Sequence, residues 1–496
     1  MTRLPRIACM LLFAVLPSTA PLLCQSGGNS NFLLNVKNDL AQEKVNLTSC
    51  GRGTLAGVSG CAETLFTGTP FHIAAGSLAP QNGVAFGLAA AEHYYPTFCP
   101  YWLDGAKKLD PGTRNACRWF WTFNAEGGAT SNESWRAGFY ASAAHLSTHT
   151  PRLSRPDAHG RTQTFTVPSP TVNFYAVATS LSRLYFYGLG PHTTPAARAD
   201  FGLTETIAGA NFIYPVHVSS LDRAGIVLQG ELNGRFPSER GSYGDTSPSI
   251  EQTFTEASAP GLTSQSNYFQ AGEGIRFIPD LPSKPQGPSF ELNYLADFQE
   301  FVASSNSGES FRRFTADLNH RLTLYTRDVG KSRPLPPHVP GTPDVPPISS
   351  TRDVTGSIAA RLFLQESIAD RGNVAPFYLQ PTIGGSDLNN QSILGSYPDY
   401  RFRAPNLLLF HGEYEQSLGK IPIGLFVGLD EAKVALTRSD IAFEHLRHTY
   451  SAGFTVHAGG LPVFYLLFAW GGPEGHHIVA NISNELLGSQ ARPSLF

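Results

Sequence analysis

The chain has 496 residues, enough for roughly two to three average domains or one large barrel. Lys and Arg total 36 and Asp and Glu total 39, so the formal charge of −3 gives no electrostatic reason to expect nucleic acid as a partner. Charged residues are only 15% of the chain and aromatic residues 11%, while 48 glycines and 37 prolines disfavour long helices. Hydrophobic residues, at 41%, are too few for a polytopic helical membrane protein, and the composition is typical of many strands and turns.

Residues 1–25 have the pattern of a secretory signal peptide. Arg3 and Arg6 precede an apolar run from Ile7 to Leu16, and small and turn-forming residues follow to Gln25. The run is too short to cross a bilayer as a helix. The alternative interpretation is a buried N-terminal helix.

Four cysteines follow this segment: Cys50, Cys61, Cys99 and Cys117. In an exported chain we expect them to form disulfides, and the sequence leaves all three connectivities open. A metal site built from the four thiolates is the weaker alternative, because the chain contains no Cys-x-x-Cys motif.

The chain divides into four parts. After the signal, residues 26–80 form a short periplasmic lead, in which Asn31–Lys44 has weak helical spacing. Residues 81–488 consist of strand-like segments, turns and loops, and residues 489–496 form a tail. The proline-rich segment Lys331–Ser350 cannot be a strand, and we expect it to be an extended exterior loop.

Period-two alternation runs through the long third part. In Arg313–Tyr325, Phe314 and Leu318 share one face while Arg313 and Asp317 share the other. Residues 290–299 and 226–233 alternate in the same way. Each segment is about 8–13 residues long, close to the length of a tilted strand that crosses a membrane.

Two environments explain such strands: a soluble β-sandwich with the apolar side inward, or a barrel with the apolar side toward lipid. Mixed-sign charges on the polar faces, aromatic residues near strand ends and the lack of helical blocks favour the barrel. At roughly 10 residues per strand, the sequence predicts an all-β fold, a closed antiparallel transmembrane β-barrel of about 16 strands.

Several segments carry a family resemblance. They read PFYLQPTIGGSD (Pro376–Asp387), LGSYPDYRFRAPNLLLFHGEYE (Leu394–Glu415), IPIGLFVGLDEAKVA (Ile421–Ala435), YSAGFTVHAGGLPVFYLLFAWGG (Tyr450–Gly472) and, upstream, LYFYGLGPHTT (Leu184–Thr194) and FGLTETIAGANFIYPV (Phe201–Val216). Together they resemble the barrel domain of the BamA/TamA family of outer-membrane proteins. The resemblance implies a bacterial outer-membrane location, contact with outer-membrane lipid, and a role in inserting or translocating client outer-membrane or secreted proteins.

The resemblance also implies a long loop that folds into the lumen, with an Arg-Gly-aromatic tip contacting acidic residues on the next two strands. Here Gly395-Ser396-Tyr397 stands at the tip, so the usual arginine is missing. Arg401 and Arg403 follow it, and the inward acidic residues are Glu413 and Asp430. Because an unpaired carboxylate in a confined lumen is costly, we expect one of these acids to pair with one of these arginines.

The family normally carries periplasmic polypeptide-binding modules before the barrel, and the short lead has no room for one. The chain therefore resembles a barrel-only member. Such barrels are thought to act through a weak seam between the first and last strands. The Gly- and Ala-rich segment Gly83–Ala91 would make a poorly packed strand there.

Catalytic and metal-binding patterns are weak. Ser142 and His145 lack an elbow motif and an orienting acid, and the pairs His445/His448 and His476/His477 lack further ligands at useful spacing. We expect no enzyme, no cofactor and no metal. The alternatives to an assembly role are a passive outer-membrane channel or surface antigen, and a soluble secreted β protein.

Overall fold

The computed structural model describes residues 32–47, 65, 70–94, 119–145, 152–156, 162–166, 170–216, 225–241, 247–279, 281, 288–328, 352–385, 392–418, 423–458 and 461–482. The predicted signal peptide, all four cysteines of the mature chain, the proline-rich segment and the tail lie outside these residues. The predictions made for them stay predictions.

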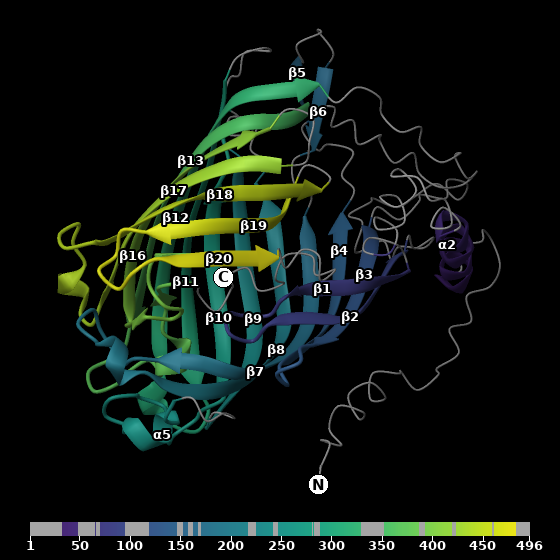
Figure 1. Ribbon diagram of the computed structural model, residues 1–496. Helices are drawn as coiled ribbons and strands as arrows, with labels where there is room; N and C mark the ends of the chain where they lie inside the picture. The colour runs from purple at the N-terminus through teal and green to yellow at the C-terminus, as the bar shows by residue number, and fades with distance from the viewer. Residues whose placement is uncertain are drawn as a thin grey trace.

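One antiparallel sheet of 16 strands dominates the described chain and curls around on itself (Figure 1). Each strand pairs with its neighbours in chain order, as expected for an up-and-down barrel. The strands are β1 (Phe71–Ser77), β2 (Val84–Tyr94), β3 (Trp119–Ala129), β4 (Trp135–His145), β7 (Thr171–Phe186), β8 (Ala199–Pro215), β9 (Ile226–Gly241), β10 (Tyr268–Phe277), β11 (Ser289–Ala303), β12 (Phe311–Asp328), β13 (Arg352–Ile368), β16 (Asn406–Ser417), β17 (Ile423–Ala435), β18 (Arg447–Ala458), β19 (Leu461–Trp470) and β20 (His477–Ile482).

The remaining elements are small and lie in the connections. Two-stranded sheets are formed by β5 (Arg152–Pro156) with β6 (Thr162–Thr166) and by β14 (Thr382–Ile383) with β15 (Phe402–Arg403). The helices are α2 (Phe32–Leu47), α5 (Ile250–Thr253) and the short 3₁₀ turns η2 (Pro195–Ala197), η4 (Ser307–Glu309), η5 (Phe377–Leu379) and η6 (Arg438–Asp440). The helix predicted in the lead is therefore present as α2. No described helix has both the length and the apolar character needed to cross a membrane.

The strands point apolar side chains outward and polar side chains inward. On β9, Leu228 and Leu232 are exposed while Gln229, Glu231 and Asn233 are buried. The other strands add to the outer belt; exposed apolar residues on them include Phe86, Phe139, Phe174, Phe212, Phe269, Phe298, Val427, Phe454 and Phe468. A soluble protein would bury these side chains, so the belt identifies a transmembrane β-barrel, and the soluble alternative is wrong.

The sheet begins earlier than the predicted boundary at residue 81. The first strand, β1, starts at Phe71, and the segment proposed from sequence as the first strand lies in β2 except for Gly83, which belongs to the preceding turn. The sequence of β1, FHIAAGS, is short and rich in small residues, so its alternation is weak.

Alternate connections of an antiparallel barrel lie at the same end. One end, here called the loop end, therefore holds the turns β1–β2, β3–β4, β7–β8 and β19–β20, together with the long connection between β13 and β16. An apolar plug fills this end; its buried members include Leu78, Leu184, Phe186, Phe201, Ile250, Phe377, Tyr378 and Tyr400. The packed ring contacts of Phe186 and Phe201 with Phe377, at 5.0 and 5.1 Å, join the wall to the long connection.

The outward belt gives a direct test in lipid. Leu232 is 56% exposed near the middle of β9, so Leu232→Arg should place a charge against hydrocarbon. We expect a loss of about 2–4 kcal/mol in the free energy of unfolding, measured by urea titration in phospholipid vesicles. Leu232→Met should stay close to the unsubstituted protein, and an equal, small effect of both changes would contradict the lipid-facing assignment.

Candidate functional site: the inserted loop and the seam

The connection between β13 and β16, residues 369–405, packs inside the barrel at the loop end and is called the inserted loop here. It is described for residues 369–385 and 392–405. Seven of its large side chains are among the most buried of the described residues: Phe377, Ile383, Tyr397, Tyr400, Arg401, Phe402 and Arg403. A long loop folded into the lumen is the arrangement that the family resemblance implies.

Arg401 ties the inserted loop to two other loops. Its Nε lies 2.7 Å from Glu474 Oε2 in the β19–β20 turn. Its two terminal nitrogens donate to the hydroxyl and the carbonyl of Thr193, both at 2.6 Å, in the β7–β8 loop. The guanidinium also lies over the rings of Tyr187 and Phe402, at 5.0 and 4.5 Å. Arg401 is thus held on all sides by charge, hydrogen bonds and aromatic rings.

Arg403 is fixed within the apolar plug. It donates to the carbonyl of Phe377 at 2.6 Å and lies between 5.7 and 5.9 Å from the rings of Phe186, Phe201 and Phe377. Burial lowers the pKa of Arg403 below its ordinary value, yet a guanidinium stays charged at neutral pH. Aromatic faces therefore take the place of a carboxylate partner around this cation.

The predicted pairing of these arginines with Glu413 or Asp430 is wrong. Both acids contact His411 instead: Nδ1 lies 2.6 Å from Asp430 Oδ1, and Nε2 lies 3.2 Å from Glu413 Oε2. The register explains this, because His411 on β16 stands directly opposite Asp430 on β17. The imidazole on the neighbouring strand therefore takes the place beside Asp430 Oδ1 that was expected for an arginine of the loop.

The tip of the inserted loop is nevertheless held in place by the backbone amide of Leu394 and the hydroxyl of Ser396. The amide of Leu394 donates to Asp430 Oδ2 at 2.9 Å. Ser396 Oγ lies 2.6 Å from Thr449 Oγ1 on β18 and accepts from the amide of Gly472 at 3.1 Å. A Cβ on Gly472 would come within 2.7 Å of Ser396 and of the Tyr397 ring, so this approach requires glycine.

Tyr397, the aromatic residue of the tip, packs against Phe402 with ring centroids 5.3 Å apart. The guanidinium of Arg447, at the start of β18, covers both rings at 5.8 and 4.1 Å and donates to the carbonyl of Pro191 at 2.5 Å. A cation therefore does lie beside the tip, and it comes from a strand. Nothing in the spacing of the sequence pointed to Arg447.

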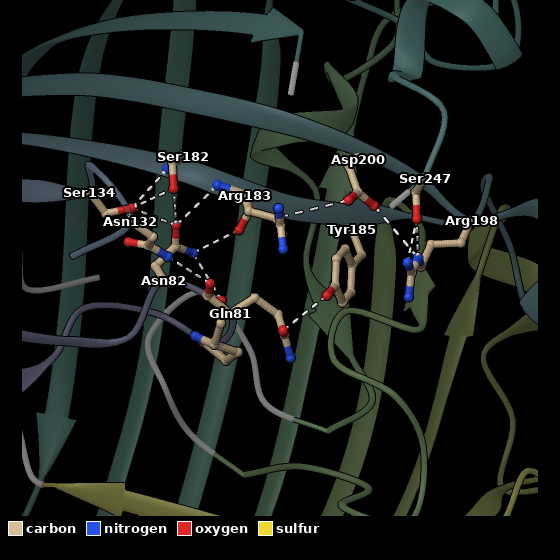
Figure 2. A network of polar contacts seen from close by, with 11 residues as sticks. Gln81, Asn82, Asn132, Ser134, Ser182, Arg183, Tyr185, Arg198, Asp200 and Ser247 are labelled. Atoms are coloured by element: carbon tan, nitrogen blue, oxygen red, sulfur yellow. Dashed lines mark hydrogen bonds and ion pairs between the residues drawn. The ribbon is translucent and has the colours of Figure 1, made fainter. Parts of the chain in front are cut away.

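A second polar cluster fastens the β1–β2 turn (Figure 2). Asn82, fully buried, donates to the carbonyl of Arg183 at 2.7 Å and accepts from the amide of Arg183 at 3.1 Å. Ser134 Oγ donates to Asn82 Oδ1 at 2.8 Å and lies 2.9 Å from Ser182 Oγ. These contacts, here called the Asn82 clamp, join the first hairpin to the β3–β4 turn and to β7.

The clamp depends on a bulge in β7. The register between β7 and β8 shifts between Leu181 and Leu184, which frees the backbone groups of Arg183 from the ladder. The carboxamide of Asn82 takes both groups and so replaces a neighbouring strand. The Asn82-Gly83 pair is a turn signal in the sequence. The structure has a turn there, in which Gln81 and Gly83 adopt positive φ angles of 68° and 78°. The role of Asn82 was missed because the bulge cannot be read from the sequence.

The ends of the sheet meet at β1 and β20 without pairing. The two strands lie side by side (Figure 1), but no ladder joins them among the described residues. The gap between them is called the seam. Both strands are short, with 7 and 6 residues against 18 for β12. The sheet therefore curls until its two edge strands are neighbours, and no ladder is formed between β1 and β20.

Two cavities adjoin these features. One, of about 640 Å³, opens at the seam between Gln81, Tyr397, Asp399 and residues 477–480 of β20. The other, of about 510 Å³, lies in the lumen beneath residues 378–382 of the inserted loop. Its charged lining consists of Arg136, Arg235, Arg276, Arg313 and Arg361 with Glu205, Asp297 and Asp317.

The weak chemical motifs gain no support from their surroundings. Among the described residues, no cluster of three His, Cys, Asp or Glu side chains could hold a metal ion. His145 packs on the ring of Trp119 at 5.2 Å, His448 on Tyr450 at 5.8 Å and His476 on Phe468 at 5.6 Å.

The fold and its inserted loop define a class: a 16-stranded transmembrane barrel whose lumen is entered by the loop before its twelfth strand. Neither a family model nor a curated protein matches the sequence.

Solved structures similar to this chain include two CdiB proteins and one BamA. CdiB from Acinetobacter baumannii has 10% identity and a TM-score of 0.43, over 83% of this chain and 59% of that one. BamA from Haemophilus ducreyi lacking POTRA domains 1-3 has 10% identity and a TM-score of 0.43, over 83% of this chain and 70% of that one. CdiB from Escherichia coli has 11% identity and a TM-score of 0.44, over 82% and 61%. The chain thus spans about three fifths of the length of the two CdiB chains.

The Asn82 clamp predicts a stability effect. Asn82→Ala would leave the partly buried N–H and C=O of Arg183 without their Asn82 partner, and a buried group left in this way costs about 1–3 kcal/mol. We expect the free energy of unfolding, from urea titration followed by tryptophan fluorescence, to fall by at least about 2 kcal/mol. Asn132→Ala is the control: it removes the bonds to the Gln81 carbonyl and the Thr130 hydroxyl at the rim of the same turn, and it should cost less than Asn82→Ala.

The His411 contacts predict a second effect. His411→Ala would remove the imidazole that contacts both Asp430 and Glu413. We expect a loss of about 2 kcal/mol, below the 3–5 kcal/mol of a fully buried pair because Glu413 is partly exposed. His411→Arg keeps the charge and should retain most of the stability in the same unfolding assay. Equal stability of the alanine variant would show that the acids do not need this partner.

Proposed function

We propose that this protein is a bacterial outer-membrane β-barrel that inserts client β-barrel proteins into, or moves proteins across, the outer membrane. The observation that carries the proposal is the unpaired edge of β1 at the seam. The resemblance of residues 376–487 to the BamA/TamA barrel points the same way. The proposal involves lipid and client proteins, and no enzymatic activity or cofactor.

The register identifies the groups that face the seam. The amide of Ala91 donates to the carbonyl of Pro70, and Phe71 stands opposite Ala90. Hydrogen-bonded and non-hydrogen-bonded pairs alternate along an antiparallel ladder. Residues 72, 74 and 76 therefore bond to β2, while the backbone N–H and C=O groups of residues 71, 73, 75 and 77 point toward the seam.

An edge of this kind favours a strand from another chain. Unpaired backbone groups within the hydrocarbon cost several kcal/mol each, and a client strand added to the edge would satisfy them. The outward side chains of β1 are apolar from Phe71 to Ala75, with Phe71 exposed, and Ile478 on β20 is 72% exposed. A client strand that enters here keeps its apolar face against lipid from the start.

The plug argues against the passive channel. Phe377, Tyr378 and Tyr400 are buried in the apolar plug at the loop end, and residues 378–382 cover the lumenal cavity. A passive pore needs a continuous aqueous path, which a packed apolar cluster obstructs. A barrel with a free edge and an obstructed lumen is better suited to exchange at its wall than to conduction.

Client folding in proteoliposomes tests the proposal. An eight-stranded outer-membrane protein diluted from urea would be followed by its gel mobility without heating, with and without this protein in the vesicles. Ala75→Pro removes a seam-facing N–H and spares the bonds to β2, because proline is tolerated on a free edge. We expect the wild-type protein to accelerate client folding at least fivefold over empty vesicles, and Ala75→Pro to lose most of this acceleration.

Ala75→Val is the matched control, since it keeps the N–H and should retain the acceleration. If Ala75→Pro accelerates client folding as much as the wild-type protein does, the proposed role of the β1 edge is wrong. No acceleration by the wild-type protein, combined with steady ionic conductance in planar bilayers, would favour the channel.

A further inference from the structure

The inserted loop contacts both edges of the seam. On the β1 side, Tyr400 Oη donates to the carbonyl of Pro80 at 3.1 Å, and Gln81 Nε2 donates to Asp399 Oδ2 at 2.6 Å. Pro80 and Gln81 belong to the turn that follows β1, and Tyr185 Oη also donates to Gln81 Oε1 at 2.9 Å. The β1–β2 turn is therefore bound to the inserted loop through Pro80 and Gln81. The next residue, Asn82, binds the same turn to β7.

On the β20 side, the same stretch of loop binds the turn before the last strand. Arg401 pairs with Glu474 at 2.7 Å, and the amide of Gly472 donates to Ser396 Oγ at 3.1 Å. A Cβ on Gly395 would lie 3.3 Å from Val479 of β20, so the loop backbone also packs directly on this strand. Residues 394–401, which make all these contacts, are called the strap.

We propose that the strap couples the two edges and holds the seam shut at the loop end, so that the seam opens from the opposite end. This deepens the proposed function, on which its consequence for clients rests. Among the described residues, the edges of β1 and β20 share no backbone pairing of their own, so the link between them at the loop end runs through the strap. At the other end, where β1 begins at Phe71 and β20 ends at Ile482, no contact of this kind joins the described residues.

Arg401 is the positioning residue of the strap. It is 1% exposed, its guanidinium is clamped between the rings of Tyr187 and Phe402, and Thr193 takes two of its donors. Its Nε is therefore presented to Glu474 in a fixed direction, and the planar fork cannot turn away to solvent. The contact with Glu474 transfers that rigidity to the β19–β20 turn.

Hydrogen–deuterium exchange in lipid nanodiscs tests the coupling without any client. In Arg401→Gln, we expect backbone exchange to rise at least tenfold in residues 471–482, and also in residues 71–83 across the seam, which Arg401 does not touch. The centre of the β11–β12 ladder should be unchanged. Glu474→Gln removes the same ion pair at its more exposed partner, and we expect the same pattern of faster exchange at smaller amplitude. This second variant keeps the test possible if Arg401→Gln does not fold.

The reverse direction gives an independent check, because coupling between two sites is reciprocal. Gln81→Ala should speed exchange in residues 471–482. Arg312→Gln, which removes the exposed pair with Glu300 at 3.3 Å on the outer wall, is the control and should leave both edges unchanged.

Acceleration confined to the edge that carries each substitution would overturn the strap. That outcome is distinguishable from failure of the proposed function, since exchange reports the edges alone and client folding reports their use. If exchange at the two edges is coupled but the protein does not accelerate client folding, the strap is supported and the proposed function is contradicted.

Discussion

The structure depends on one constraint: within hydrocarbon, every backbone N–H and C=O needs a partner inside the protein. The antiparallel ladders meet that requirement from β1 through to β20, and the inversion of side chains follows from it. Side chains such as Leu232 then face lipid while Glu231 faces the interior. At the seam of the described sheet this requirement is not met by a ladder. The strap and one of the two cavities adjoin the seam.

The loop end offsets that weakness with side chains instead of backbone pairing. The Asn82 clamp fixes the first hairpin, His411 and Asp430 fix the tip of the inserted loop, and Arg401 fixes the last turn. Asn82, Asp430 and Arg401 are themselves buried, so water competes little for their polar contacts. The barrel therefore combines a fastened loop end with two edge strands, β1 and β20, that form no ladder with each other, an arrangement suited to a wall that opens and recloses.

Much of the fold followed from the sequence. The period-two alternation of residues 226–233 and 313–325 gave the correct inward and outward faces, because side-chain direction in a strand depends only on parity. The site was harder. The partner of Asp430 depends on strand register, and the role of Asn82 depends on a bulge near Ser182, and neither is encoded in local composition. The first strand was missed because its small residues carry little alternation.

One consequence concerns the chemical durability of the rim. Asn82 is followed by Gly83, and an asparagine before glycine is the arrangement in which the side-chain amide is most readily lost by attack of the next backbone nitrogen. The product, an aspartate or its isomer, would turn the amide donor that now meets the carbonyl of Arg183 into a negatively charged oxygen. Burial and hydrogen bonding shield this amide while the hairpin stays docked. Each undocking event exposes the amide, so the fraction of molecules deamidated at Asn82 should increase with the time that the first hairpin spends undocked.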